Sequence, residues 1–69
     1  MKILVTGTSQ GIGKAIAELF LKEGHDVIGI DRQKSEIEHK CYTHHQLDVR
    51  DYANLPEISG VNILINNAG

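Results

Sequence analysis

Residues 6–13 read TGTSQGIG, with three glycines spaced as G-x-x-x-G-x-G. The segment 2–6 before the first glycine is mostly apolar and β-branched, which predicts a strand buried on both faces. The segment 12–23 after it has apolar residues at helical spacing, which predicts an amphipathic helix with one apolar stripe. The residues of that stripe are Ile12, Ile16, Leu19 and Phe20. The stretch is therefore predicted to be a tight turn from a strand into a helix.

A second apolar run completes a strand–helix–strand unit. Gly24 follows the predicted helix at the position where a left-handed residue commonly ends one. Residues 26–31 (DVIGID) are rich in β-branched side chains and close on an acid. Three such elements in about 30 residues form a βαβ unit, whose two strands are parallel and whose crossover is right-handed.

The rest of the chain extends this alternation. We expect a polar edge strand at 41–47, a short helix at 52–58 and an apolar strand at 61–66, whereas residues 32–40 fit either a short helix or a loop. The fold class is therefore α/β. We predict a single domain over 1–69, the half domain of a Rossmann-like open parallel sheet, with four strands in the order 3-2-1-4 and flanking helices.

The glycine turn has the chemistry of a pyrophosphate site. Such a site needs backbone N–H groups that face the phosphates, a helix N-terminus behind them, and no Cβ atoms in the way. Gly7, Gly11 and Gly13 meet these needs, and Ser9 offers a hydroxyl either to a phosphate or as a helix cap. The alternative is a glycine-rich turn that only connects two elements.

Two other glycine patterns fail on the same residues. The fingerprint G-x-G-x-x-G/A, begun at Gly11, requires a small residue where the chain has Ile16. A Walker-type loop requires glycine at position 8 and a hydroxyl residue after Lys14, but the chain has Thr8 and Ala15. The main sequence evidence for an ATPase or GTPase is therefore missing.

Asp31 ends the second predicted strand, 18 residues after Gly13. An acid at about this spacing accepts hydrogen bonds from the adenosine ribose hydroxyls, and its charge repels a 2′-phosphate. Arg32, by contrast, favours NADP, because its guanidinium could pair with the 2′-phosphate. We expect the cofactor to be NAD, with NADP second.

Taken together, four motifs in order resemble those of the short-chain dehydrogenase/reductase family. They are Thr-Gly-x-x-x-Gly-x-Gly at 6–13, Asp31, Leu-Asp-Val at 47–49 and Asn-Asn-Ala-Gly at 66–69, so the resemblance covers the whole chain. The family transfers hydride between a nicotinamide and a carbonyl or alcohol.

The resemblance also implies roles for individual residues. Ser9 and Ile12 would contact the pyrophosphate, and Asp48 and Val49 would hold the adenine. Residues Asn67, Ala68 and Gly69 would line the ribose on the nicotinamide side. Taken without the resemblance, Asp48 fits a solvated turn or cap, and the asparagines fit turn residues.

The family's catalytic Tyr-x-x-x-Lys pair has no match in the chain. Gln46 stands four residues after Tyr42, and Pro56 stands four residues after Tyr52. No catalytic residue is therefore assigned, and we expect the chain alone to be inactive. Two other functions stay open: a stand-alone nucleotide-binding or interaction module, and a non-functional truncated product.

Composition narrows the partners and the compartment. A net charge of -2 without a basic run gives no support for nucleic-acid binding. Cys41 is the only cysteine, the start lacks a signal sequence, and no apolar run approaches the roughly 18 residues of a membrane span. We therefore expect a cytoplasmic protein without a membrane partner. An open fourth-strand edge predicts self-association.

One further group of residues contains potential metal ligands. It consists of His39, Cys41, His44 and His45. Imidazole and thiolate bind zinc, but this spacing matches no four-ligand pattern, and a polar edge strand accounts for the residues without a metal. No metal is predicted.

Overall fold

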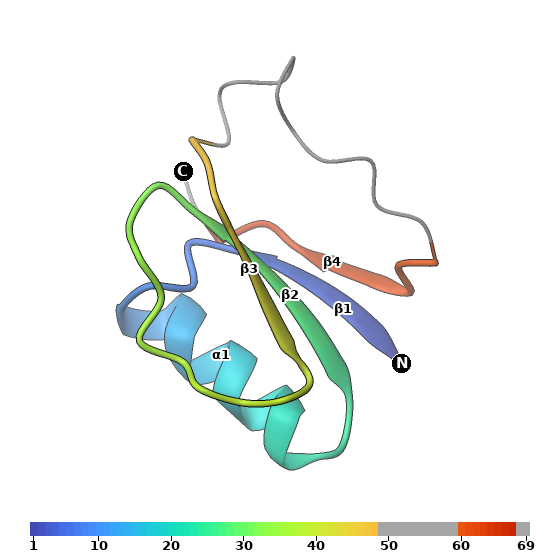
Figure 1. Cartoon of the computed structure of the whole chain (residues 1–69). Helices are drawn as coiled ribbons and strands as arrows, with labels where there is room; N and C mark the ends of the chain where they lie inside the picture. The colour runs from blue at the N-terminus through green and yellow to red at the C-terminus, as the bar shows by residue number, and fades with distance from the viewer. Residues whose placement is uncertain (49–59, 68–69) are drawn as a thin grey trace.

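Four parallel strands and one helix make up the part of the chain that the computed structural model describes, residues 1–48 and 60–67. The elements are β1 (Lys2–Thr6), α1 (Gly11–Lys22), β2 (Asp26–Asp31), β3 (Tyr42–Gln46) and β4 (Ile63–Ile65). The strand order is β3-β2-β1-β4 and every pair is parallel, which confirms the predicted topology (Figure 1). The predicted helix at 52–58 lies outside the described residues.

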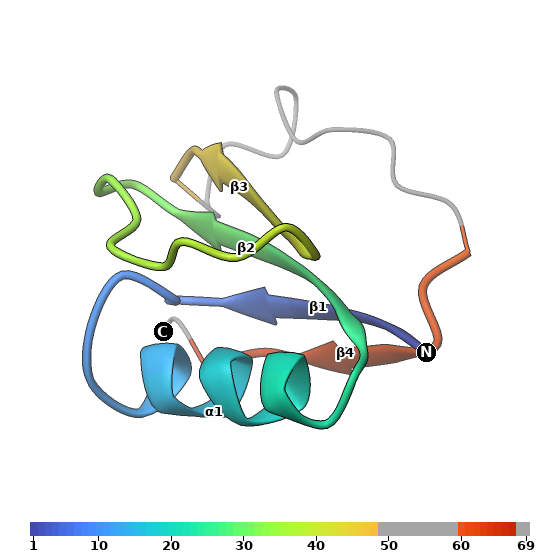
Figure 2. The same ribbon diagram turned by 60° about the horizontal axis from the view of Figure 1, so that its bottom comes forward.

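Helix α1 covers one face of the sheet (Figure 2). The side chains of Ile3, Val5 and Val27 point to that face and are fully or almost fully buried. They pack with Ala17 and Leu21 of the helix to form the core. The buried strand residues alternate along the chain, so they lie on one face of the sheet, and the apolar side of α1 packs on that face to form one apolar layer.

The buried stripe of α1 differs from the predicted one. Ile12 is 72% exposed and Leu19 is 56% exposed, so the prediction that both lie on the core face is wrong. The buried residues of α1 are instead Gly13, Ala17 and Leu21. Two of these three are small, so the helix lies close to the sheet. Ile16 and Phe20 of the predicted stripe are partly buried and pack against the core as expected.

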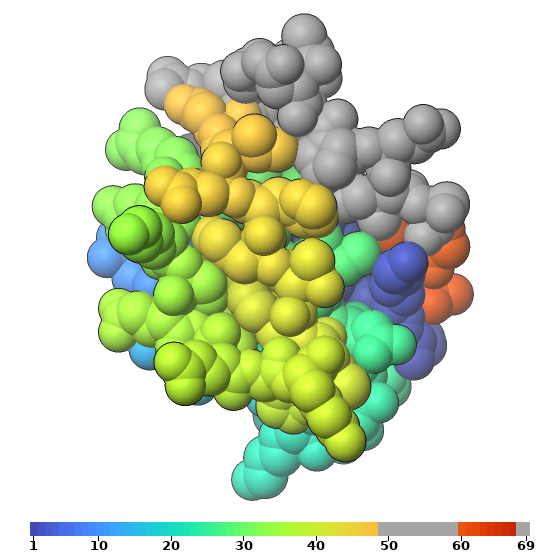
Figure 3. Space-filling model, viewed as in Figure 1, coloured from blue at the N-terminus to red at the C-terminus, as the bar shows by residue number. Residues whose placement is uncertain are grey.

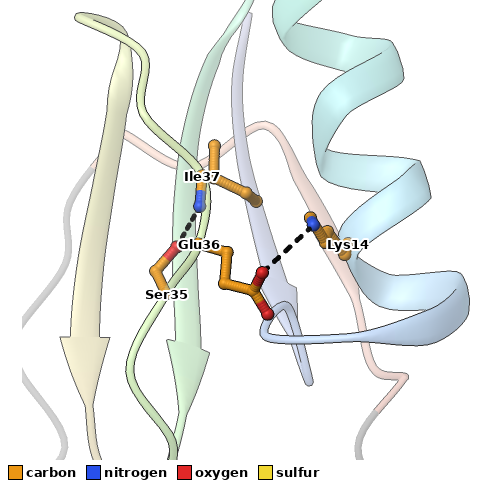
Figure 4. A network of polar contacts seen from close by, with 4 residues as sticks. All are labelled: Lys14, Ser35, Glu36 and Ile37. Atoms are coloured by element: carbon orange, nitrogen blue, oxygen red, sulfur yellow. Dashed lines mark hydrogen bonds and ion pairs between the residues drawn. The ribbon is translucent and has the colours of Figure 1, made fainter.

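The segment between β2 and β3 contains no helix, which settles the choice left open for 32–40 in favour of a loop. Ile37 packs against the core, and its N–H donates to the Ser35 hydroxyl at 2.9 Å. Glu36 pairs with Lys14 of α1 at 3.9 Å (Figure 4). The loop is thus held against the helix, and with β3 it covers much of one side of the molecule (Figure 3).

The sheet face opposite α1 carries apolar side chains. Ile28 and Ile30 are buried there, and Leu64 of β4 is 62% exposed. Strand β4 forms one edge of the described sheet. In the described part of the chain, no helix is long and apolar enough to cross a membrane.

Gly13 allows the first turn of α1 to approach β1, and this generates a prediction. A Cβ atom at Gly13 would overlap the carbonyl oxygen of Gly7 and lie 2.6 Å from Nδ2 of Asn67. We expect Gly13→Ala to lower the free energy of unfolding by about 1–3 kcal/mol, as overpacking does. Denaturant unfolding measures the change, with Glu18→Ala on the exposed side of α1 as control. A Gly13→Ala protein as stable as the parent would contradict this packing.

Candidate functional site

The carboxyl ends of β1, β2 and β4 meet at the peptide groups of Gly7. Its N–H donates to the carbonyl of Ile30 at 2.8 Å, and its own carbonyl accepts from Nδ2 of Asn67 at 3.3 Å. Gly7 has a φ of 73°, in the left-handed region that disfavours other residues. The turn is thereby fixed to both neighbouring strands at the sheet edge where parallel α/β sheets bind ligands.

The start of α1 is open. Gly11 has a φ of 61° and is exposed, and no atom of the described residues lies within 4 Å of the position that a Cβ would occupy. Gln10 occupies the N-cap position without a side-chain hydrogen bond, and the first turn of α1 carries no acidic residue. The free N–H groups and the positive end of the helix dipole therefore face a space suited to an anion.

Ser9 joins the glycine turn to the end of β2. Its N–H donates to Oδ2 of Asp31 at 3.1 Å, and its hydroxyl donates to the carbonyl of Gln33 at 3.1 Å. Ser9 is 3% exposed. The alternative that this hydroxyl caps the helix is wrong, because the cap position belongs to Gln10. In this structure the hydroxyl holds the loop after β2 instead.

The Asp31 carboxylate is held in its charged form. Burial alone would raise the pKa of Asp31, but hydrogen bonds from Gln33 and Ser9 and the proximity of His44 outweigh it, and the net pKa is lowered. One of these bonds runs from the Gln33 N–H to Oδ1 at 2.8 Å. A half-buried carboxylate is thus placed beside the turn, while Arg32 next to it is exposed.

Thr6 ties the segment after β4 to the same place. The Thr6 hydroxyl donates to Oδ1 of Asn66 at 3.1 Å and accepts from the N–H of Asn67 at 2.9 Å. Asn67 therefore contacts both Thr6 and Gly7. Thr6 was not predicted as a site residue, although a threonine directly before the turn glycine is part of the motif at 6–13.

The remaining predicted site residues lie at several places in the chain, some of them outside the described residues. Ile12 lies on the exposed first turn of α1, next to Gly11. Asp48 follows β3 and is half-buried. Val49, Ala68 and Gly69 lie outside the described residues.

A group of polar side chains that was not predicted from the sequence lies beneath the turn. Thr8 is fully buried, and its hydroxyl lies 2.8 Å from the hydroxyl of Tyr42, which in turn lies 2.8 Å from Nδ1 of His44. Among the described residues, no three His, Cys, Asp or Glu side chains are placed to hold a metal ion. His44, considered above as a metal ligand, here belongs to a hydrogen-bonded chain.

The Asp31 hydrogen bonds predict a pH-dependent contribution to stability. Since the pKa of Asp31 is lowered on folding, the carboxylate stabilises the fold above the pKa of the unfolded chain, and this contribution is lost as the pH falls through the folded pKa. We expect Asp31→Asn to lower the melting temperature at pH 7, with the difference closing in strong acid. Asp26→Asn, at the exposed start of the same strand, is the control. An equal effect of Asp31→Asn at every pH would argue against this assignment.

Comparisons with known proteins agree with this architecture. The sequence profile described as short chain dehydrogenase matches residues 1–69. Benzil reductase ((S)-benzoin forming) of Bacillus subtilis is 38% identical over 96% of this chain and 32% of its own length. The NADP-dependent 3-hydroxy acid dehydrogenase YdfG of Escherichia coli K12 is 36% identical over 100% of this chain and 34% of its own. The chain thus spans about a third of the length of the curated relatives it matches.

Solved structures show the same relation. The ligand-free aldohexose dehydrogenase of Thermoplasma acidophilum superposes with a TM-score of 0.75 at 34% identity, covering 99% of this chain and 29% of its own. A short-chain dehydrogenase/reductase from Burkholderia vietnamiensis gives a TM-score of 0.67 at 27% identity, over 75% and 27% of the two chains. The profile match over all 69 residues and the shared fold establish that this chain belongs to the short-chain dehydrogenase family.

Proposed function

We propose that this chain is the dinucleotide-binding portion of an oxidoreductase that transfers hydride between a nicotinamide and a carbonyl or alcohol. One observation carries the proposal: the open helix N-terminus at Gly11 and the Asp31 carboxylate are joined through Ser9, at 3.1 Å from its N–H to the carboxylate. This pairing suits a dinucleotide, because a helix N-terminus attracts the charged pyrophosphate and a carboxylate accepts hydrogen bonds from the hydroxyls of the adenosine ribose.

The residues present fit such a cofactor. The N–H groups at the start of α1, with Ile12 beside them, would hold the pyrophosphate. Asp31 would accept hydrogen bonds from the adenosine ribose, and Asp48 with Val49 would hold the adenine. Asn67, followed by Ala68 and Gly69, would line the ribose on the nicotinamide side. When bound, the nicotinamide ring supplies the position that gives or takes the hydride.

We infer that the cofactor is NAD. Hydrogen bonds hold Asp31 charged, and a carboxylate at this place repels a 2′-phosphate. Arg32 and the name of one relative, an NADP-dependent dehydrogenase, favour the phosphorylated cofactor. The carboxylate supports NAD because it is held by the N–H of Ser9 in the turn and by the N–H of Gln33 in the loop after β2, whereas Arg32 is exposed.

The chain's own residues supply binding and orientation of the cofactor. Neither tyrosine, Tyr42 or Tyr52, has a lysine four residues later, and Tyr42 is bonded to Thr8 and His44. We therefore propose that the acid–base pair of the family's reaction is not contributed by this chain, and that the chain alone transfers no hydride.

We also propose that the chain self-associates through the edge formed by β4. This strand ends the described sheet, and Leu64 in it is 62% exposed. A short apolar edge strand is a surface on which a second strand can pair.

Calorimetric titration with both cofactors tests the binding proposal. We expect NAD to bind more tightly than NADP. Asp31→Ala is expected to weaken NAD binding and to reduce the ratio of the two Kd values by about tenfold, because it removes the acceptor for the ribose hydroxyls and the charge that repels a 2′-phosphate. Asp26→Ala is the matched control on the same strand. Tighter binding of NADP by the parent chain would overturn the NAD assignment, and no binding of either cofactor would overturn the proposal as a whole.

A further inference from the structure

A chain of hydrogen bonds runs beneath the glycine turn, from the end of β1 across to the loop after β2. The Thr8 hydroxyl lies 2.8 Å from the Tyr42 hydroxyl, and the Tyr42 hydroxyl lies 2.8 Å from Nδ1 of His44. Nε2 of His44 lies 2.9 Å from the carbonyl oxygen of Gln33. The same carbonyl accepts the hydroxyl of Ser9, so both ends of the chain reach the turn residues 8 and 9.

The direction of these bonds follows from their last member. A carbonyl oxygen only accepts, so Nε2 of His44 must carry a hydrogen. In neutral histidine, Nδ1 is then an acceptor and takes the hydrogen of Tyr42. The Tyr42 oxygen, having donated its only hydrogen, accepts from Thr8. Neutral His44 therefore sets the orientation of every hydroxyl up to Thr8.

The packing around this chain places it where it can hold the turn. A Cβ atom on Gly29 would overlap the Tyr42 hydroxyl and lie 2.5 Å from Oγ1 of Thr8, so glycine leaves the space that both groups occupy. Thr8 is fully buried within the turn that joins β1 to α1. Its hydroxyl thus has Tyr42 as the partner that fixes it in place.

We infer that Tyr42 and His44 are positioning residues for the cofactor, acting through Thr8, and that protonation of His44 releases this link. The inference rests on the proposed dinucleotide site. Both residues lie on β3, away from the glycine motif in the sequence. The site described above uses His44 only through its proximity to Asp31, and it gives Tyr42 no role toward the cofactor. Their effect on the cofactor is transmitted by the conformation of the turn.

Protonation of His44 reverses the chain. Both ring nitrogens then donate, so Tyr42 must accept from Nδ1 and turn its own hydrogen toward Thr8. The Thr8 hydroxyl loses its acceptor in a fully buried position. The groups that face His44 are the Tyr42 phenol on β3, the Gln33 carbonyl on the loop and the Asp31 carboxylate at the end of β2. On the α1 side, Lys14 forms an ion pair with Glu36 of the loop.

Tyr42→Phe tests the link because it removes the hydroxyl and keeps the ring. We expect it to raise the Kd for NAD about three- to fivefold at pH 8, the effect of one lost neutral hydrogen bond. At a pH low enough for the NMR signals of the His44 ring to show that it is protonated, the ratio of the two Kd values is expected to approach one. Attraction between charged His44 and the phosphates acts equally on both proteins and cancels in this ratio. A ratio that does not change with pH would overturn the inference.

A second arm needs no cofactor and separates this inference from the proposed function. NMR signals of the Thr8 amide and methyl groups are followed from pH 8 to pH 5 in the parent chain, in Tyr42→Phe and in His45→Gln. His45 is the matched control, because it pairs with Ile30 and points to the opposite face of β3. We expect the Thr8 signals to follow the His44 ring in the parent and in His45→Gln, but not in Tyr42→Phe.

The two arms fail in different ways. Thr8 signals that ignore the His44 titration, or that still follow it in Tyr42→Phe, would overturn the link whatever the chain binds. A parent chain that shows the Thr8 transition but binds neither NAD nor NADP would overturn the proposed function and, with it, the cofactor-positioning role of Tyr42 and His44.

Discussion

The contact between Gly7 and Gly13 is the constraint on which the site depends. Gly7 directly follows β1, is bonded to β2 through Ile30 and to the segment after β4 through Asn67, and lies against the first turn of α1. Only a residue without a Cβ allows the helix to come this close. This packing contact places the start of α1 beside the glycine turn that Asp31 borders, and it therefore shapes the helix end that is proposed to bind the pyrophosphate.

This view changes the meaning of the three glycines. All three were expected to leave space for a pyrophosphate, but in the structure each glycine has a different function. Gly11 leaves open space at the helix start, Gly7 adopts a left-handed conformation, and Gly13 is buried against the backbone of Gly7. Gly11 thus borders the proposed ligand, and Gly13 provides helix–strand packing.

Much of the fold could be predicted because its signals are local. The apolar runs at 2–6 and 26–31 and the glycine turn between strand and helix determine a βαβ unit, and the handedness rule orders the strands. The position of Asp31 beside the turn followed from the same reasoning, because parallel strands end at one sheet edge. Predicted bounds were off by one or two residues at most elements: α1 begins at Gly11, and β4 covers only Ile63–Ile65.

The rest depends on distances that a sequence does not carry. Which stripe of α1 is buried depends on how close the helix lies to the sheet. The small residues Gly13 and Ala17 are buried, whereas Ile12 and Leu19 are exposed. The chain from Thr8 through Tyr42 to His44 joins residues more than 30 positions apart and needs the gap above Gly29. Polar residues on an edge strand give no sign of such a partner, and the residues at 39–45 were accounted for only as those of a polar edge strand.

Mapping NAD onto the chain by NMR is the most direct test of the central claim that the turn around Gly7 and the Asp31 carboxylate form one dinucleotide site. The account predicts that amide signals of residues 7–13, Asp31 and Asn67 shift together during a titration with NAD. Shifts confined to the opposite sheet face around Leu64, or no shift at all, would contradict it.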